Sequence, residues 1–372
     1  MFGLTAEHYS INPKEEYDVF LVRQKEFQEF YQDLLGTLNS GKVPKYVVYG
    51  SFGIGKTHFL YHLKKLVSDV SEPIYLQTPP SHRRTSFTEF YGAVLSEIGR
   101  TRVMDVLGRG AGKPGKLRKL GMSEDLALVV ENAIKNDKTF LLWKFLSGIR
   151  LKSSEADDLE TIHTELAPDD AVAILNALGA LNEEAGGKPL LLLVDEFEST
   201  SNIGGDARVV FTEAVRSLVD ESSRVGVVFA VTARALAEMP GPIDYEPVRR
   251  RIGLTNYIQF KDYNENELEE FVYEAIQYRR DKKFDIKGAL AGLKTDETVD
   301  SQSYPFSKEA VKEIVSSVAL FAANNKIEAA RPKELLELMD KGMRVALLNK
   351  KPFVSKDVIR KVSDEVVEGL SL

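Results

Sequence analysis

A glycine-rich segment holds the residues whose types and spacing most clearly suggest chemistry: Gly50, Ser51, Phe52, Gly53, Ile54, Gly55, Lys56 and Thr57. Glycines at this spacing let backbone N–H groups turn inward around phosphate groups, and a helix that begins beside them points its positive N-terminus at the same phosphates. Lys56 would neutralise the β- and γ-phosphates, and the hydroxyl of Thr57 would hold Mg²⁺. We therefore expect this segment, with His58 directly after it, to bind ATP together with Mg²⁺.

Two adjacent acidic residues, Asp195 and Glu196, supply the second half of the expected site. They follow the apolar run 190–194, which is typical of a strand buried on both faces of a parallel sheet. Ligands bind at the carboxyl ends of such strands, so Asp195 suits the Mg²⁺ shell and Glu196 suits a general base that polarises the attacking water. ATP hydrolysis is the expected activity. A solvated turn at the end of a strand is the alternative interpretation of the two acids.

Phosphoryl transfer also needs cations aimed at the charge that develops on the γ-phosphate, and a neighbouring subunit often supplies them. The sequence offers Arg249, Arg250 and Arg251, which we expect in a loop after the apolar run 225–232. It also offers Arg331, which opens a predicted helix and could reach the nucleotide from another side. The alternatives are a basic surface turn for the first group and a salt-bridged helix end for Arg331.

The elements that must position these residues alternate between strands and helices. Apolar and β-branched runs predict strands near 46–49, 74–77, 190–195 and 225–232, and apolar residues at helical spacing predict helices at 23–38 and 56–67. This alternation indicates an α/β fold of the P-loop type, with a doubly wound parallel sheet. Beyond residue 261 the pattern indicates helices alone, which we interpret as a helical lid.

The predicted organisation has four parts: an entry segment and helix at 1–44, an ATP-binding core at 45–260, a helical lid at 261–350 and a last helix at 351–372. A long helical insertion within the core, at about 81–188, is implied because a minimal strand-helix-strand unit needs only about 30 residues.

Residues 100–119 of this insertion carry seven basic residues against one acidic residue, and also four glycines. This composition predicts a mobile, positive loop, because glycines let the backbone approach phosphates that Arg and Lys neutralise. The candidate DNA-facing residues are Arg109, Lys113, Lys116, Arg118 and Lys119. A disordered, solvated loop is the alternative.

Composition excludes several other classes of function. The absence of cysteine excludes disulfides, thiolate zinc sites and iron–sulfur clusters. His58 and His62 are four residues apart, as metal ligands on a helix can be, but no third ligand is evident, so packing or surface roles are expected. A net charge of −7 argues against wholesale coating of nucleic acid. With no apolar run near the about 20 residues of a membrane span and no secretory signal, we expect a cytoplasmic protein without membrane contact.

Taken together, these motifs resemble the AAA+ ATPases, and within them the origin-initiator clade of origin-binding ATPases and transposition regulators. The resemblance covers roughly residues 23–348, with Gly50–Thr57 as the Walker A motif and Leu190–Glu196 as the Walker B motif. It implies that Arg23 helps to border the adenine, that residues 247–252 form the finger loop and that Arg331 opens the sensor 2 helix.

Three departures from the clade are also visible in the sequence. Thr232 stands where the sensor 1 asparagine is expected, so Thr232 would have to substitute for it. The chain stops soon after the lid, so the winged-helix DNA reader of origin initiators is not expected. The third departure is the long insertion before the Walker B motif, whose stretch 142–148 and following helix resemble ATP-binding components of bacterial phage-defence systems such as BREX. Its Trp143 is expected to anchor the core rather than to stack on a nucleic-acid base.

Two classes of function fit these observations. The first is a DNA-associated ATPase of replication, transposition or phage defence that assembles head to tail into a homo-oligomeric ring or filament, with ATP at subunit interfaces and with protein partners in a multi-component system. The alternative is an ATP-dependent protein-interaction switch that makes no direct DNA contact. A small-molecule kinase fits less well, because adjacent acids at a strand end suit water activation better.

Overall fold

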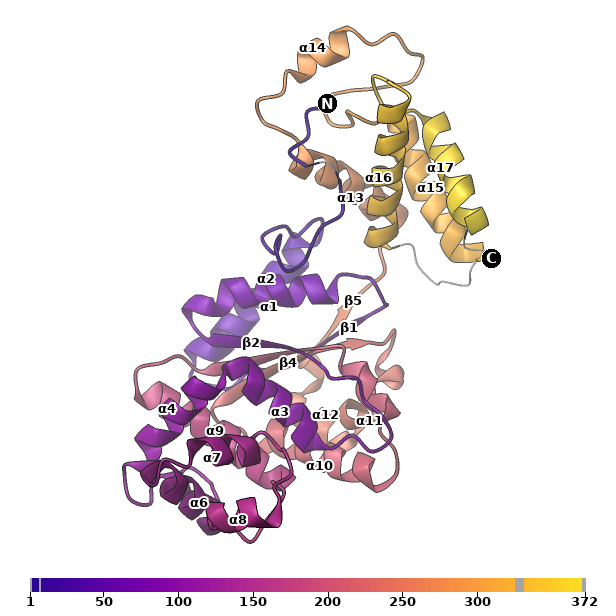
Figure 1. The fold of residues 1–372 in the computed structure, drawn as a ribbon. Helices are drawn as coiled ribbons and strands as arrows, with labels where there is room; N and C mark the ends of the chain where they lie inside the picture. The colour runs from indigo at the N-terminus through magenta and orange to yellow at the C-terminus, as the bar shows by residue number, and fades with distance from the viewer. Residues whose placement is uncertain (1, 7, 325–330, 370–372) are drawn as a thin grey trace. The chain divides into compact units, whose positions relative to one another are not determined.

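The computed structural model describes residues 2–6, 8–324 and 331–369. The chain folds into two compact units (Figure 1). We name the unit made of Gln28–Gly50 and Phe59–Gln259 the sheet unit, and the unit made of Met1–Phe27, Ser51–His58 and Phe260–Leu372 the lid unit. The chain therefore enters each unit more than once.

A five-stranded sheet lies at the centre of the sheet unit, in the order β2-β3-β4-β1-β5. The strands are β1 (Lys45–Gly50), β2 (Glu72–Gln77), β3 (Leu190–Asp195), β4 (Val225–Thr232) and β5 (Tyr257–Phe260). The pairs β1–β4, β2–β3 and β3–β4 are parallel, so the carboxyl ends of these four strands share one edge of the sheet. The predicted doubly wound parallel sheet is confirmed, with β5 added at its border.

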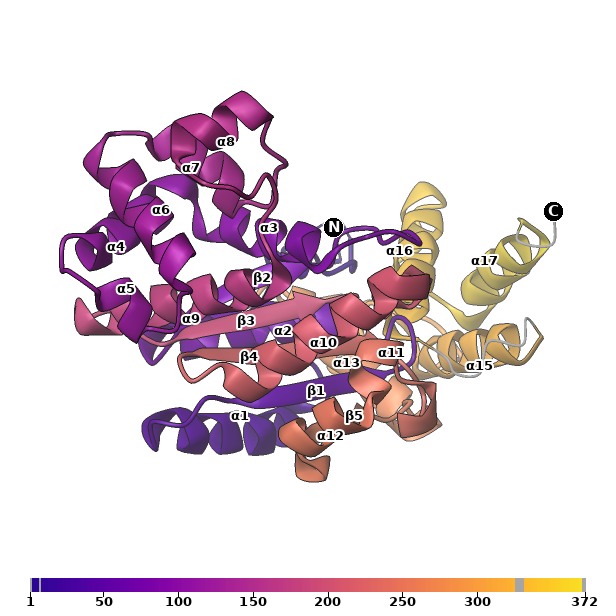
Figure 2. The same ribbon diagram turned by 90° about the horizontal axis from the view of Figure 1, so that it is seen from below.

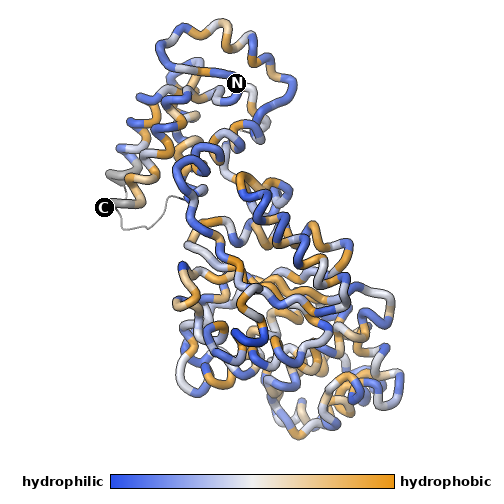
Figure 3. The backbone as a smooth tube through the Cα atoms, turned by 180° about the vertical axis from the view of Figure 1, so that it is seen from behind, coloured by the Kyte–Doolittle hydropathy of each residue, from blue (hydrophilic) through white to orange (hydrophobic). Residues whose placement is uncertain are grey.

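Both faces of the sheet are covered, because its strands are apolar at nearly every position. Leu192 and Phe229 contribute to a large core on one face. On the other face, Phe30 of α1 (Gln24–Asn39) lies with its ring centre 5.1 Å from that of Tyr46 and 5.0 Å from that of Phe59 in α2 (Lys56–Leu66). The strands accordingly form a hydrophobic block in Figure 3.

The insertion between β2 and β3 is helical and gathers on the β2 side of the sheet (Figure 2). Its helices are α3 (Phe87–Ile98), α4 (Arg100–Ala111), α5 (Lys116–Lys119), α6 (Glu124–Lys135), α7 (Thr139–Leu146), α8 (Ser153–Leu159) and α9 (Pro168–Glu184). Trp143 is partly buried against the core, as expected of a packing residue.

The prediction of a mobile loop at residues 100–119 was wrong, because α4 and α5 occupy most of it. Val103 and Leu107 are four residues apart on α4, and both are fully buried, as is Leu117 of α5. Apolar residues at helical spacing thus outweighed the glycine and charge content that favoured a loop.

The segment after β3 forms α10 (Gly205–Glu221), and the segment after β4 forms α11 (Gly241–Asp244) and α12 (Glu246–Ile252). The prediction of a loop at Arg249–Arg251 was also wrong, because the three arginines lie on α12. Pro247 in the first turn favours a helix start, and the buried Val248 and Ile252 hold one face of α12 in the core.

The lid unit contains α13 (Glu265–Arg279), α14 (Ile286–Ala291), α15 (Lys308–Asn324), α16 (Pro332–Leu348) and α17 (Lys356–Gly369). Ile276, Ile314, Met339 and Ile359 of four of these helices share one core. Tyr9, with no exposed surface, joins the same core, so the N-terminal segment is built into the lid unit. Among the described residues, no helix has the length and apolar character needed to cross a membrane.

Candidate nucleotide site

The glycine-rich segment connects β1 to α2 and needs glycine at two of its positions. Gly53 has φ 78° and Gly55 has φ 106°, in the region that side chains disfavour. A Cβ on Gly53 would lie 3.0 Å from Cδ of Arg331, whereas open space surrounds Gly55. Lys56 Nζ donates to the Ser51 carbonyl over 2.9 Å, which keeps the ammonium over the loop. This donor set, backbone N–H groups, an ammonium and the Thr57 hydroxyl, fits a phosphate chain with Mg²⁺.

The lid unit brings Arg331 to the same loop. Its guanidinium carbon lies 5.3 Å from the centre of the Phe52 ring, and Phe52 is 63% exposed. Arg331 immediately precedes α16, where its backbone N–H donates to Glu334 Oε2 over 3.1 Å. Burial raises the pKa of Glu334, while Arg331 opposes that rise. The predicted sensor residue and the phosphate loop are therefore in contact.

Arg23 is buried beside the start of the lid rather than exposed at a helix end. Its guanidinium carbon lies 3.9 Å from the centre of the Tyr263 ring, and it donates to the Lys261 carbonyl. Burial raises the pKa of Tyr263 to about 12. The preceding Val22 has φ 65°, which is strained for a β-branched residue, and its N–H donates to Glu274 Oε2 over 2.6 Å. Both bonds fix the entry segment to the lid.

Asp195 is held in one position at the carboxyl edge of the sheet. It is 3% exposed, and its Oδ2 accepts a hydrogen bond of 2.8 Å from the Tyr75 hydroxyl. Its Oδ1 accepts a bond of 2.9 Å from the Glu196 N–H, and Thr78 Oγ1 donates to its carbonyl over 2.6 Å. Burial and the Asp195 carboxylate raise the pKa of Tyr75, so this hydroxyl stays a donor. A carboxylate fixed in this way suits Mg²⁺, which prefers oxygen ligands.

Glu196 is exposed and adopts the left-handed conformation, with φ 54°. Its Oε2 accepts a hydrogen bond of 2.8 Å from Gln77 Nε2 at the end of β2. Gln77 lies outside the predicted site. In the sequence, Gln77 is visible only as a polar residue at the end of a predicted strand. Its position opposite Asp195 follows from the register in which β2 pairs with β3.

Thr232 ends β4 opposite Gly50 of β1, so the strand between the two predicted half-sites carries it. Its N–H donates to Glu198 Oε2 over 3.0 Å. Glu198 is a second residue that the predicted site did not include. It follows Glu196 by two positions in the turn 197–202 and holds the end of β4 in place.

The three arginines of α12 each face a carboxylate. Arg249 pairs with Asp244 over 3.4 Å, Arg251 pairs with Asp220 over 2.6 Å, and Arg250 pairs with Glu246 one turn earlier in the same helix. The Arg250 side chain is 75% exposed. Surface pairs of this kind contribute at most about 1 kcal/mol, so the arginines can exchange partners.

Ion pairs also occupy three of the five candidate DNA-facing residues. Arg109 pairs with Asp105 over 2.7 Å, Arg118 pairs with Glu124 over 3.0 Å, and Lys116 pairs with Glu184. Lys113 and Lys119 are exposed. The positive surface predicted here is therefore largely neutralised by neighbouring acids.

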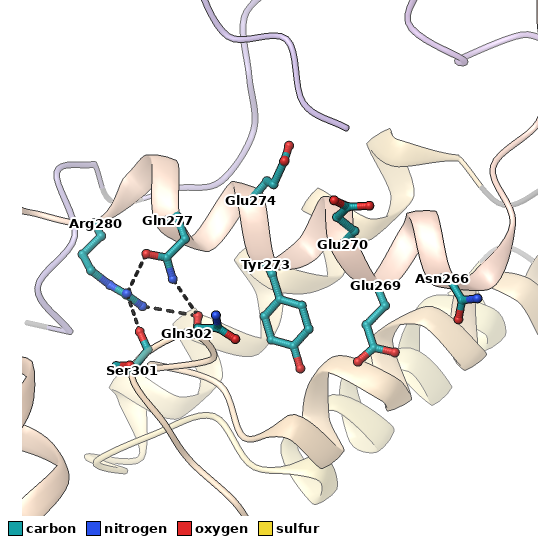
Figure 4. A pocket seen from close by; sticks show the side chains of 9 residues that line it. All are labelled: Asn266, Glu269, Glu270, Tyr273, Glu274, Gln277, Arg280, Ser301 and Gln302. Atoms are coloured by element: carbon teal, nitrogen blue, oxygen red, sulfur yellow. Dashed lines mark hydrogen bonds between the residues drawn. The ribbon is translucent and has the colours of Figure 1, made fainter. Parts of the chain in front are cut away.

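A separate open pocket of about 710 Å³ lies along α13 (Figure 4). Glu269, Glu270 and Glu274 line it, and Arg280 is bonded to Gln277 and to the segment 301–302. Three carboxylates would repel a phosphate chain, so this pocket does not suit a nucleotide. Within the described part of the chain, no group of three or more His, Asp or Glu side chains could hold a metal ion.

The chain is similar in fold to two solved structures. It matches Cdc6p from Pyrobaculum aerophilum with 13% identity and a TM-score of 0.50, covering 93% of this chain and 67% of that one. It matches a Drosophila ORC chain, from a structure of ORC bound to DNA, with 14% identity and a TM-score of 0.51, covering 97% of this chain and 64% of that one. The chain thus spans about two thirds of either structure's length. These likenesses show a shared fold, with a parallel sheet covered by helices.

Comparison of sequences gives the family. No curated protein matches the chain. A family model described as BREX system ATP-binding protein BrxC/D matches residues 128–327, which cover most of the insertion, the Walker B strand and the first part of the lid. Because this match extends over more than half of the 372 residues, the chain belongs to the BREX system ATP-binding BrxC/D family.

Proposed function

We propose that this protein hydrolyses ATP with Mg²⁺ and acts on DNA as an oligomeric component of a multi-component phage-defence system. The observation that carries the proposal is the conformation of the loop from Gly50 to Thr57. Gly53 and Gly55 adopt backbone angles that present N–H groups to an anion, and Lys56 is held over the loop.

In the proposed reaction, Lys56 and the loop N–H groups bind the β- and γ-phosphates, and Thr57 and Asp195 hold Mg²⁺. When bound, Mg²⁺ would neutralise the negative charge that develops on the phosphate oxygens during phosphoryl transfer. Both residue sets are expected to serve one nucleotide, because β1 and β3 end at the same edge of the sheet and the loop continues from β1.

Glu196 is the proposed general base that takes a proton from the attacking water. Two features support this role. Its carboxylate is exposed at a strand end, and its position is set by a left-handed backbone and by Gln77. Thr232 takes the place of the sensor asparagine in this proposal, and the bond from its N–H to Glu198 links the end of β4 to the turn that follows Glu196.

The arginines of α12 are proposed to complete the site of a neighbouring subunit, while Arg331 acts within its own chain. Head-to-tail contacts of this kind generate rings or open filaments. Arg250 is the most exposed of the three and has only a carboxylate of its own helix as a partner, so it can be released most easily.

The test measures ATP binding and phosphate release in wild-type protein and in Lys56→Ala. We expect Lys56→Ala to lose ATP binding, because the loop then lacks its only ammonium, whereas Lys65→Ala at the other end of α2 serves as a matched control for lost charge. Near-normal ATP affinity of Lys56→Ala would overturn the assignment of the loop.

A protein-interaction switch is the second candidate, and the surface of the insertion favours it. Phe140, Ile149 and Ile162 are 65%, 51% and 87% exposed, as residues of a protein-binding surface often are. DNA binding measured with ATP at about 50 and 200 mM salt separates the candidates. Binding that weakens steeply with salt supports the first, and absence of binding at both concentrations supports the switch.

A further inference from the structure

A tight turn after β2 presents two adjacent arginines to solvent. The Thr85 N–H donates to the His82 carbonyl over 3.0 Å, and the His82 N–H donates to Thr85 Oγ1 over 2.9 Å. Arg83 and Arg84 occupy the two central positions and are exposed, whereas Thr85 is 3% exposed and anchors the turn. Prolines at 79–80 restrict the backbone that leads into it. The two guanidinium groups therefore project from a backbone that is already ordered.

The helix that lies against this turn, α10, carries a third exposed arginine, Arg208. The Gly204 N–H donates to the Arg83 carbonyl over 3.0 Å, and Cγ of Arg83 lies 3.1 Å from the place of a Cβ on Gly204. Arg208 follows one helical turn later, about 6 Å along the helix axis. Its guanidinium packs where a side chain on Gly241 would stand. The turn with Arg83 and Arg84 is thus in contact with the start of α10, the helix that carries Arg208.

The charges of these arginines are not balanced by neighbouring acids. Within the residues that the structure describes, Arg83, Arg84 and Arg208 form no ion pair, unlike the arginines of α4 and α12. No acidic residue occurs from position 78 to position 88, and Asp206 is the nearest acid in the sequence to Arg208. In a chain with net charge −7, an unneutralised cluster of this kind points to an anionic ligand.

Two exposed apolar residues follow the third arginine on α10. Val209 and Val210 are 64% and 49% exposed at the start of α10. Arginine forks bind phosphate oxygens, and apolar side chains contact sugars or base edges, so the combination matches a nucleic acid better than a free phosphate or an acidic peptide.

We propose that Arg83, Arg84 and Arg208, together with the exposed Val209 and Val210 of α10, bind a nucleic acid, with the arginines on its phosphate backbone. This inference rests on the proposed association with DNA and moves the contact from α4 and α5, where the basic residues are largely paired, to the turn after β2. Because the turn is closed by its own hydrogen bonds, little conformational entropy is lost on binding.

The test compares wild-type protein with Arg83→Gln/Arg84→Gln/Arg208→Gln by fluorescence anisotropy, with ATP present, on a labelled mixed-sequence duplex and on one of its strands alone. Dissociation constants are measured at several salt concentrations between about 50 and 200 mM. We expect binding to weaken by at least about tenfold and the slope of log K against log salt to fall by about three, one for each lost phosphate contact. Melting temperatures check that the variant is folded.

Arg109→Gln/Lys113→Gln/Lys119→Gln is the matched control, because it removes the same charge from α4, α5 and the residues between them. The inference holds if this control keeps the wild-type slope while the first variant loses it. It is overturned if the control loses binding and the first variant does not, an outcome that leaves the proposed function intact. Absence of wild-type binding to both DNA forms, with ATP hydrolysis preserved, overturns the DNA association and the inference together.

Discussion

Glu196 combines a backbone conformation that side chains disfavour with an exposed carboxylate at the end of β3. A left-handed angle at a residue with a side chain costs of the order of 1–3 kcal/mol, and it persists only where the surroundings enforce it. Here its N–H is bound by Asp195 Oδ1 and its carboxylate by Gln77. The enforced backbone conformation therefore fixes the position of the carboxylate, and the proposed role as a general base requires such a fixed position.

Glu196→Gln should keep ATP binding and lose hydrolysis by about 10²-fold or more, since the amide cannot accept the proton of the attacking water. Steady-state phosphate release and equilibrium ATP binding measure the two properties separately. Glu221→Gln, at the last position of α10, provides the matched loss of one carboxylate. Unchanged turnover of Glu196→Gln would remove it from the role of base.

Phe52 gives a second prediction at this scale, because its ring and a γ-phosphate would compete for the guanidinium of Arg331. Phe52→Ala should raise ATP affinity about two- to fivefold, the equivalent of a cation–π contact of about 0.5–1 kcal/mol. In an Arg331→Ala background the same change should have no effect, which isothermal titration can determine as a double-mutant cycle. Weaker ATP binding in both backgrounds would instead mean that the ring contacts the nucleotide itself.

The glycine-rich loop after β1 and the placement of Asp195 and Glu196 at the end of β3 could be predicted from the sequence, because each lies next to an apolar run whose direction and end are evident. Tyr75, Gln77 and Glu198 could not. Their contacts depend on the strand order β2-β3-β4, which places residues far apart in the sequence side by side, and spacing along one strand does not reveal that order.

At the scale of elements, the insertion shows how packing overrides composition. Residues 100–119 have the glycines and charges of a loop, yet α4 packs against α6 and α9 through a buried apolar face. Glycines of the insertion between β2 and β3 differ in their surroundings. Gly92 of α3 lies against the Ser147 carbonyl, where a Cβ would clash, whereas Gly108 of α4 faces open space.

Gly92→Ala and Gly108→Ala should therefore change stability in opposite directions. In Gly108→Ala the gain in helix propensity is unopposed, so the free energy of unfolding should rise by about 0.5–1 kcal/mol. In Gly92→Ala the clash with rigid backbone outweighs that gain, and we expect a net loss of about 1–3 kcal/mol. Denaturant unfolding of both variants measures the difference. Equal stabilisation would show that α3 and the segment after α7 are not packed closely.

At the scale of the whole molecule, the proposed assembly divides each catalytic site between two chains. The base, Glu196, and the arginines of α12 would then belong to different subunits of one interface. A chain that has lost Glu196 keeps its α12 arginines, and a chain that has lost these arginines keeps Glu196. A mixture of two inactive chains therefore tests the arrangement directly.

Mixing Glu196→Gln chains with Arg249→Ala/Arg250→Ala/Arg251→Ala chains in equal amounts should restore ATPase activity, because about a quarter of head-to-tail interfaces would join an intact base to intact arginines. Phosphate release by each variant alone and by the mixture is the measurement, with light scattering under ATP as an independent measure of assembly. No recovery, together with activity strictly proportional to enzyme concentration, would contradict shared sites.

Tyr9 lies near the start of the chain and packs against helices near its other end, which has a consequence for folding. Tyr9 contributes to the same core as Phe306 and Met339, so its partners are separated from it by about 300 residues. The sheet unit, built from Gln28–Gly50 and Phe59–Gln259, can collapse during synthesis before those helices emerge. The lid unit must instead close a very long loop, and contacts of such high sequence separation form slowly. On the ribosome, Phe2 and Tyr9 therefore remain without their core partners until α13, α15 and α16 are complete.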